Sequence, residues 1–159
     1  MALAQGNDKI LFVGTPLAVG VGRYNGTGLV TGFDTRFQLP LGSNFALTGK
    51  TGLEVFFIKG KYKEYYRYYY DAAAGLSIPI ALGPRFYIVD GLHTDLNVGV
   101  DIGVSRLAAT SFRFEPMAGY AIPLSNGHYI DVGASFVTSF SSGSGAFSFN
   151  FAYGLNLGR

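Results

Sequence analysis

Several features on which ordinary soluble proteins rely are missing or scarce in this chain. Cysteine is absent, which excludes a disulfide framework and thiolate metal sites. Charged residues make up only 14% of the chain, well below the roughly one quarter that is usual in soluble domains. A soluble protein of this size covers its surface with charge, and this chain has little charge for that purpose.

Other absences narrow the possible functions. No apolar run is long enough for a transmembrane helix. The net charge of +2 is too small to indicate a nucleic-acid partner. The two histidines, His93 and His128, fall in predicted turns, and Ser125 near His128 is ordinary turn chemistry. We therefore expect no enzyme, no cofactor, and no catalytic, cofactor-binding or metal-binding residues.

What the sequence does contain is period-two alternation, most clearly between residues 146 and 157. Every odd position there is large and apolar and every even position is small or polar, which places all the bulk on one face of a strand. The same alternation predicts eight strands, and no helix is predicted. The predicted strands are 10–21, 29–39, 45–58, 66–88, 95–106, 112–124, 129–140 and 146–157. Two prolines interrupt the fourth segment, which leaves a division into two shorter strands open.

The charged residues fall on the small, glycine-rich face of these segments. They are Asp34, Arg36, Lys50, Glu54, Arg67, Asp71, Arg85, Asp95, Asp101, Arg113, Glu115 and Asp131. If this face pointed to water, we would expect it to carry long charged side chains at high density. Glycine, alanine and serine with a few charges suit a narrow lumen, and the bulky apolar face then meets lipid.

The sequence thus predicts an all-β fold, an eight-stranded antiparallel up-and-down transmembrane β-barrel over residues 10–159. Residues 1–9 are predicted to be an N-terminal tail, in which Ala2-Leu3-Ala4 resembles the end of a cleaved signal peptide. The short turns and both termini are expected to face the periplasm. The two predicted aromatic girdles consist of Tyr24, Tyr62, Tyr65, Tyr66 and Tyr68 outside, and of Phe37, Phe45, Phe86 and Tyr129 inside.

An eight-stranded barrel has an interior that side chains fill, so its charges must be paired. We expect Asp34 to lie opposite Lys50 and to form a cross-strand ion pair. We also expect Arg67, Arg85 and Arg113 to bridge acidic residues on neighbouring strands, namely Asp71, Asp95, Asp101 or Glu115. This lumen charge network is interpreted as a structural plug, and the alternative is a narrow or gated path for ions.

One surface segment also carries a possible function. It is a basic, tyrosine-rich outer loop with Lys59, Lys61, Tyr62, Lys63, Tyr65 and Tyr66. Such a loop can bind the anionic head groups of lipopolysaccharide or another outer-membrane protein. The alternative is a solvated loop above an aromatic belt.

Short motifs give the chain a family resemblance. They are Ser77-Ile-Pro-Ile80 with Arg85-Phe-Tyr87, Gly119-Tyr120, and Tyr153-Gly-Leu-Asn-Leu157. On these residues the chain resembles the small outer-membrane barrels of the OmpA/OmpX type, and more narrowly the porin-like outer membrane protein β-barrel domain of Bacteroidota. Such barrels usually end on an aromatic residue, whereas this sequence ends in Gly158-Arg159. The resemblance implies roles in adhesion, envelope integrity or larger outer-membrane complexes.

The predicted function is therefore that of a monomeric protein in the lipid bilayer of the bacterial outer membrane, with a structural or interaction role. Its partners would be lipid or detergent, with lipopolysaccharide or other outer-membrane proteins as further candidates and no nucleic acid. The first alternative is a narrow or gated channel for ions or small solutes. The second is a soluble β-barrel that binds an apolar ligand.

Overall fold

The computed structural model describes residues 8–21, 26–139 and 144–158. The predicted signal remnant Ala2–Ala4, the girdle residue Tyr24 and the terminal Arg159 lie outside these ranges. The elements are β1 (Ile10–Val21), β2 (Thr27–Gly42), β3 (Phe45–Ile58), α1 (Gly60–Tyr70), β4 (Ala74–Val89), β5 (Leu92–Gly103), β6 (Ser111–Pro123), β7 (Tyr129–Ser139) and β8 (Ser144–Asn156).

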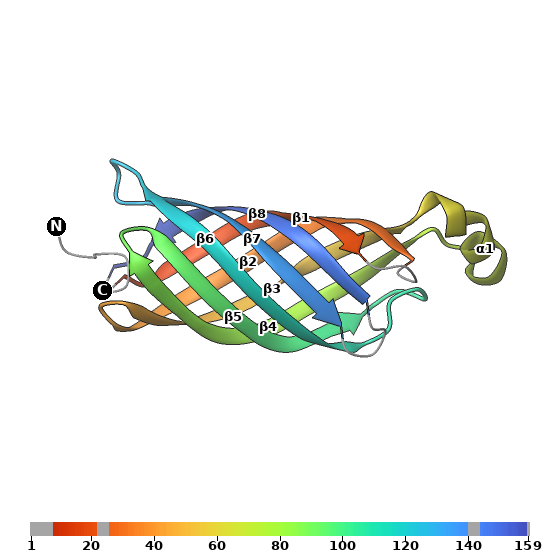
Figure 1. Cartoon of the computed structure of the whole chain (residues 1–159), viewed down its shortest axis with the longest axis horizontal. Coiled ribbons are helices and arrows are strands. Elements are labelled where there is room, and N and C mark those ends of the chain that lie inside the picture. The colour runs from red at the N-terminus through yellow and green to blue at the C-terminus, as the bar shows by residue number, and fades with distance from the viewer. Residues whose placement is uncertain (1–7, 22–25, 140–143, 159) are drawn as a thin grey trace.

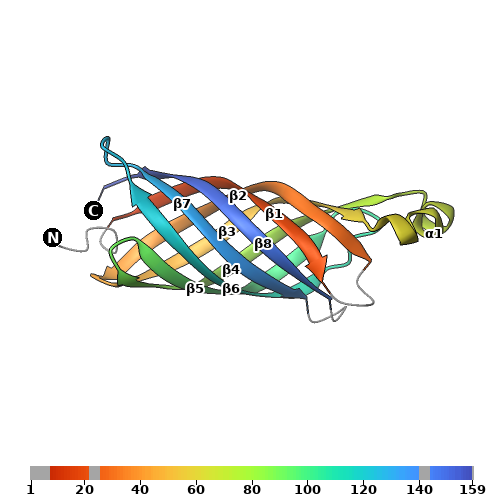
Figure 2. The same cartoon turned by 45° about the horizontal axis from the view of Figure 1, so that its top comes forward.

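The eight strands form one closed barrel in sequence order, which confirms the predicted fold class (Figure 1). Each strand pairs antiparallel with the next. The barrel closes where β1 pairs with β8, from Ile10 opposite Asn156 to Val21 opposite Gly145. The turns at 43–44, 90–91 and 124–128 lie at the end that holds both termini, called here the terminal end, and α1 projects from the opposite, loop end (Figures 1 and 2).

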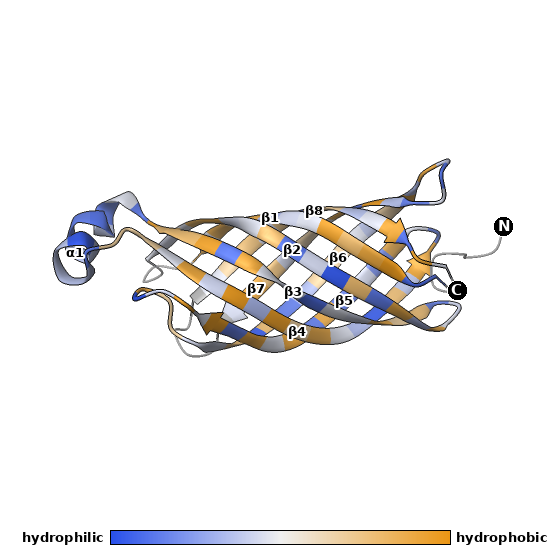
Figure 3. Cartoon of the chain, turned by 180° about the vertical axis from the view of Figure 1, so that it is seen from behind, coloured by the Kyte–Doolittle hydropathy of each residue, from blue (hydrophilic) through white to orange (hydrophobic). Residues whose placement is uncertain are grey.

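Large apolar side chains are exposed along every strand, whereas most of the buried, inward positions are small or polar, with Ile10 and Phe12 among the exceptions. Hydrophobic and hydrophilic residues accordingly alternate along the strands (Figure 3). On β8, Phe149 is 53% exposed and Phe151 is 60% exposed, while the alternating Ser148 and Asn150 are buried. Small inward residues are needed because the wall coils tightly. A Cβ atom at Gly83 would collide with the backbone carbonyl of Leu96 on the neighbouring strand.

The predicted strand 66–88 is wrong in its first part, because residues 60–70 form helix α1. Asp71 ends the helix in the left-handed conformation, with φ 52°, and its N–H donates to the carbonyl of Arg67. Along the helix the rings of Tyr65 and Tyr69 pack in a tilted arrangement, with centroids 4.6 Å apart, at the i,i+4 spacing that helices bring together. Within the described ranges, no helix has the length and hydropathy that crossing a membrane requires.

Candidate functional site

Ten of the twelve charged residues predicted for the lumen lie inside the barrel. They form two clusters, and ion pairs connect the residues within each cluster. The terminal-side cluster consists of Arg36, Arg85, His93, Asp95 and Asp131. The loop-side cluster consists of Asp34, Lys50, Glu54, Asp101, Arg113 and Glu115. The strands position these groups because inward-facing residues recur every second position at successive heights in the barrel.

The terminal-side cluster is built around Arg85, which is fully buried. Its Nε and Nη2 donate to both oxygens of Asp95 at 2.9 and 2.7 Å, and its Nη1 donates to Asp131 at 3.1 Å. The guanidinium group lies 5.0 Å from the ring centre of Phe12, and Arg36 approaches the same ring at 5.6 Å. Bidentate pairing and stacking on an aromatic face suit arginine's planar group, so these contacts fix its orientation.

His93 belongs to this cluster, although the sequence placed it in a turn. Its Nδ1 lies 3.0 Å from Asp95, and its Nε2 lies 3.1 Å from Asp131 without the alignment of a hydrogen bond. The structure places His93 in β5, two residues from Asp95 and therefore on the same face. The two-residue spacing between His93 and Asp95 indicates that both face the lumen. The sequence did not predict this for His93 because the strand was expected to begin at residue 95, whereas β5 begins at Leu92.

The terminal end of the interior is closed by a further polar layer. The Tyr129 hydroxyl donates to the carboxylate of Asp8 at 2.8 Å, and Asn156 donates to the same oxygen at 3.0 Å. Above them the Tyr87 hydroxyl donates to Gln38 at 2.7 Å. Tyr129 is buried, with 5% of its surface exposed, so its predicted place in the inner aromatic girdle is wrong.

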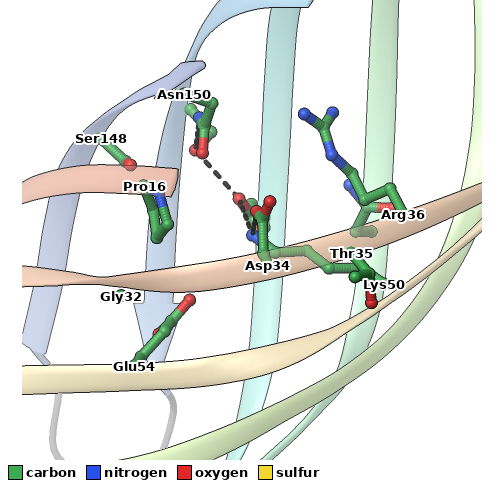
Figure 4. A network of polar contacts seen from close by, with 12 residues as sticks. Pro16, Gly32, Asp34, Thr35, Arg36, Lys50, Glu54, Ser148 and Asn150 are labelled. Carbon is green, nitrogen blue, oxygen red and sulfur yellow. Dashed lines mark hydrogen bonds and ion pairs between the residues drawn. The ribbon is translucent and has the colours of Figure 1, made fainter. Parts of the chain in front are cut away.

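The loop-side cluster is built around Arg113, which contacts three carboxylates. Its Nε donates to Glu115 at 2.9 Å, and its two terminal nitrogens donate to Glu54 at 3.0 Å and to Asp101 at 2.8 Å. Lys50 donates to both oxygens of Glu115 at 3.1 and 3.2 Å. All five groups form one network with Asp34, and part of this network is drawn in Figure 4.

The expected contact between Asp34 and Lys50 is present, at 3.4 Å, but not in the expected register. The residue opposite Lys50 is Arg36, and Asp34 lies opposite Gly52. The turn lies at 43–44, later than the centre of the expected turn 40–44, so the pairing differs by two residues from the expected one even with the register shift between Pro40 and Gly42. The ion pair is therefore diagonal, which the long lysine side chain can reach.

Arg67 and Asp71 were predicted to belong to the lumen network, and this is wrong. Both are exposed, Arg67 on α1 and Asp71 at its C-terminal end. The error follows from extending the fourth strand through the helix. The tyrosines Tyr62, Tyr65, Tyr66 and Tyr68, predicted to form the outer girdle, also lie on α1 and project beyond the barrel wall.

The residues of the predicted basic loop lie together on α1 and at its start. Lys59 precedes the helix, and no residue of the helix is buried. Tyr65 is 57% exposed and Tyr68 is 84% exposed, while the Lys61 ammonium lies 4.7 Å from the ring centre of Tyr62. This arrangement presents aromatic faces and positive charges to whatever meets the loop end.

Above the loop-side cluster the interior is hollow. A cavity of about 340 Å³ lies between the loop ends of the strands, with Glu54, Asp101 and Arg113 among its lining residues. Tyr66 of α1 and Leu107 of the β5–β6 connection also line it. The terminal half of the barrel is therefore filled by side chains, whereas the loop half leaves space for a small molecule.

Comparison with known proteins shows similarity in fold. No family model matches the chain, and no curated protein matches it in sequence. The crystal structure of Ail, the attachment invasion locus protein of Yersinia pestis, aligns with 94% of this chain and 99% of that chain, at a TM-score of 0.59 and 11% identity. The Ail complex with the heparin analogue sucrose octasulfate covers 93% and 98%, at a TM-score of 0.59 and 11% identity.

The structure of Ail in a phospholipid bilayer nanodisc covers 93% of this chain and 99% of that chain, with a TM-score of 0.55 and 12% identity. At these identities the similarity concerns the fold alone. It agrees with the predicted OmpX-like barrel architecture, and it gives no support to the narrower resemblance to the Bacteroidota domain.

Proposed function

We propose that this chain is an integral β-barrel of the bacterial outer membrane that acts as an adhesion or interaction protein through α1. In this proposal the terminal end faces the periplasm and α1 stands outside the cell. A membrane location is supported by the continuous apolar exterior, since an exposed patch of this extent is costly in water. Ail, a structural neighbour, was determined in a phospholipid bilayer.

The observation that carries the interaction role is the exposure of α1. Eleven residues make an isolated helix only marginally stable, and this one buries none of its side chains. Its exposed tyrosines offer large, amphipathic contact area at low cost in side-chain entropy. The three lysines at 59, 61 and 63 favour an anionic partner, such as a sulfated or phosphorylated saccharide.

The ligand class is supported by one of the structural neighbours. Ail was crystallised with a heparin analogue, sucrose octasulfate, which is a densely anionic saccharide. Lipopolysaccharide, with its phosphorylated head groups, presents the same chemistry on the outer membrane itself. We therefore expect α1 to bind anionic saccharides of either origin.

The test is a binding titration of the barrel in nanodiscs on immobilised heparin and on immobilised lipopolysaccharide. The triple variant Lys59→Gln, Lys61→Gln, Lys63→Gln should weaken binding roughly a hundredfold, since each lost charge-assisted contact removes about 1 kcal/mol. The wild-type affinity should also fall as salt is added. Lys9→Gln, a basic residue at the terminal end, is the matched control and should leave the affinity unchanged. Equal binding by the triple variant and the wild type would refute the proposal.

A role as a conducting channel receives less support. The terminal-side cluster and the polar layer of Asp8 and Tyr129 fill the interior across the terminal half of the barrel. We expect planar-bilayer recordings to show no large, steady conductance. A selective, reproducible current would instead favour the channel.

A further inference from the structure

The cavity at the loop end offers a second site, independent of α1 as an adhesive surface. Its volume of about 340 Å³ falls within the range of small-molecule sites. It is bounded below by side chains of the loop-side cluster and surrounded by inward-facing residues of the strands. Its chemistry divides into a charged floor and largely apolar walls.

The floor presents carboxylate oxygens to the cavity. The side chains of Glu54 and Asp101 are 10% and 14% exposed, whereas that of Arg113 is 2% exposed. The nitrogens of Arg113 already donate to three carboxylates, as described above. Ionised carboxylates only accept hydrogen bonds, so the floor can bind a donor and offers little to an anion.

The floor also carries an excess of negative charge. The loop-side cluster contains four carboxylates and two basic groups, whereas the terminal-side cluster balances two carboxylates with two arginines. A surplus of carboxylates in a largely buried cluster is costly unless a positive charge compensates it. The cavity adjoins the cluster that has the surplus, so a cation bound there would supply the missing charge.

The walls indicate what kind of cation this is. Val30, Phe56 and Ile58 line the cavity, and Leu107 and Tyr66 lie toward its mouth. A bare or hydrated metal ion needs a set of oxygen ligands, and no cluster suited to a metal occurs among the residues that the structure describes. Aromatic faces and aliphatic walls instead favour an organic cation.

We propose that the cavity binds an amphiphilic organic cation. Its ammonium group donates to Glu54 and Asp101, and its apolar body lies along Phe56, Ile58 and Val30. Tyr66 of α1 borders the cavity, but this role requires neither the lysines of α1 nor any passage through the barrel. The ligand enters and leaves by the loop end, because the terminal half is filled.

The probe is 2-phenylethylammonium, with 2-phenylethanol as a neutral compound of matched shape. Each is titrated into the ¹⁵N-labelled barrel in zwitterionic nanodiscs, and amide chemical shifts are followed. We expect the cation to cause saturable shifts at Glu54, Asp101 and Leu107 and none at Asp131. The alcohol should bind at least about tenfold more weakly, because it lacks the charge-assisted hydrogen bonds. Equal affinity for the two compounds would overturn the proposal.

Variants distinguish the contribution of the charged floor to binding from the contribution of the space above it. Asp101→Asn keeps the shape of the side chain and leaves Arg113 paired with Glu54 and Glu115. It should weaken binding of the cation at least about tenfold and leave binding of the alcohol unchanged. Glu54→Gln repeats the test if the first variant fails to fold. Ala146→Phe, which fills the cavity, should abolish saturable binding, whereas Asp71→Asn, outside the cavity, should change nothing.

Two further outcomes would also overturn the proposal. One is that unsaturated, linear shifts are seen with both probes, which would mean partition into the lipid only. The other is that sodium or calcium ions at millimolar concentration displace the organic cation completely, which would make the site inorganic. Retention of full affinity in Asp101→Asn and Glu54→Gln would likewise remove the carboxylates from the site.

Discussion

The two ends of the barrel interior solve the problem of buried charge differently. In the terminal-side cluster two arginines meet two carboxylates, and Phe12, Tyr87 and Tyr129 fill the remaining space. In the loop-side cluster one arginine holds three carboxylates beneath a cavity. Both clusters have the same alternating strands around them, so the difference lies only in the inward side chains.

The comparison indicates that the terminal half of the interior stabilises the barrel, whereas the loop half can bind a ligand. A charge-balanced, fully packed layer stabilises one state and offers nothing to a ligand. A layer with surplus charge beside empty space is less stable alone and gains stability from a bound partner. The same barrel wall can therefore hold a rigid plug at one end and a receptive site at the other.

The largest expected effect tests this contrast at the two arginines. Arg85→Met should lower the free energy of unfolding by about 3–5 kcal/mol, because it leaves two fully buried carboxylates without their main partner. Arg113→Met should cost less, about 1–3 kcal/mol, because water and cations in the cavity can reach Glu54 and Asp101. Urea titrations in lipid vesicles measure both, and a reversed order would break the comparison.

The next effect tests the premise that both halves share a lipid-facing exterior. Phe151→Lys, on the outer face of β8, should cost roughly 2–4 kcal/mol near the middle of the bilayer. Phe151→Leu preserves an apolar side chain and should cost less than about 1.5 kcal/mol. If the lysine variant folds into vesicles as well as the leucine variant does, the exterior does not face lipid.

The smallest effect sharpens the claim that the loop side carries surplus negative charge. Ser148 is buried and lines the cavity, so a charge placed there lies within the field of the loop-side cluster. Ser148→Lys should be about 1 kcal/mol more stable than Ser148→Asp in the same vesicle titration. If the aspartate variant is the more stable one, the surplus is compensated within the chain.

Most of the fold could be predicted from the alternation of bulky and small residues, because this pattern is contained within each strand. The predicted bounds 10–21 and 45–58 agree with β1 and β3 residue by residue. A strand with a bulky and a small face needs no knowledge of its partners to be recognised. Closure follows because neighbouring strands must satisfy every backbone group in lipid.

The errors in the predicted strands arose at residues 60–70, where the spacing of the tyrosines fits both a strand and a helix. Tyrosines at 66, 68 and 70 alternate as in a strand, and tyrosine favours strands, yet the tyrosines at 65 and 69 also have helical spacing. A strand of 66–88 would be about twice the length that crosses a bilayer, and that was the signal for a break. Arg67 and Asp71 were placed in the lumen as a direct result.

The interior contacts were harder to foresee than the inward positions. The sequence placed Arg113 inside and gave Asp101, on the neighbouring strand β5, as an expected partner, and this contact is present. The contact of Arg113 with Glu54 could not be foreseen, because Glu54 lies on β3, which is distant in the chain. Their meeting depends on the register around the whole circumference. Lys50 lies opposite Arg36, and not opposite Asp34, because the turn between β2 and β3 is at 43–44, later than the centre of the expected turn.

The pairing of β1 with β8 has a consequence for how the protein reaches its native state. Ile10 bonds to a strand that ends at Asn156, so the closing contacts join the two ends of nearly the whole chain. Such a contact carries the largest loop-closure entropy and cannot form during synthesis until the last strand has emerged. Until the final strand docks, the two open edges of the sheet stay exposed to pairing with other chains.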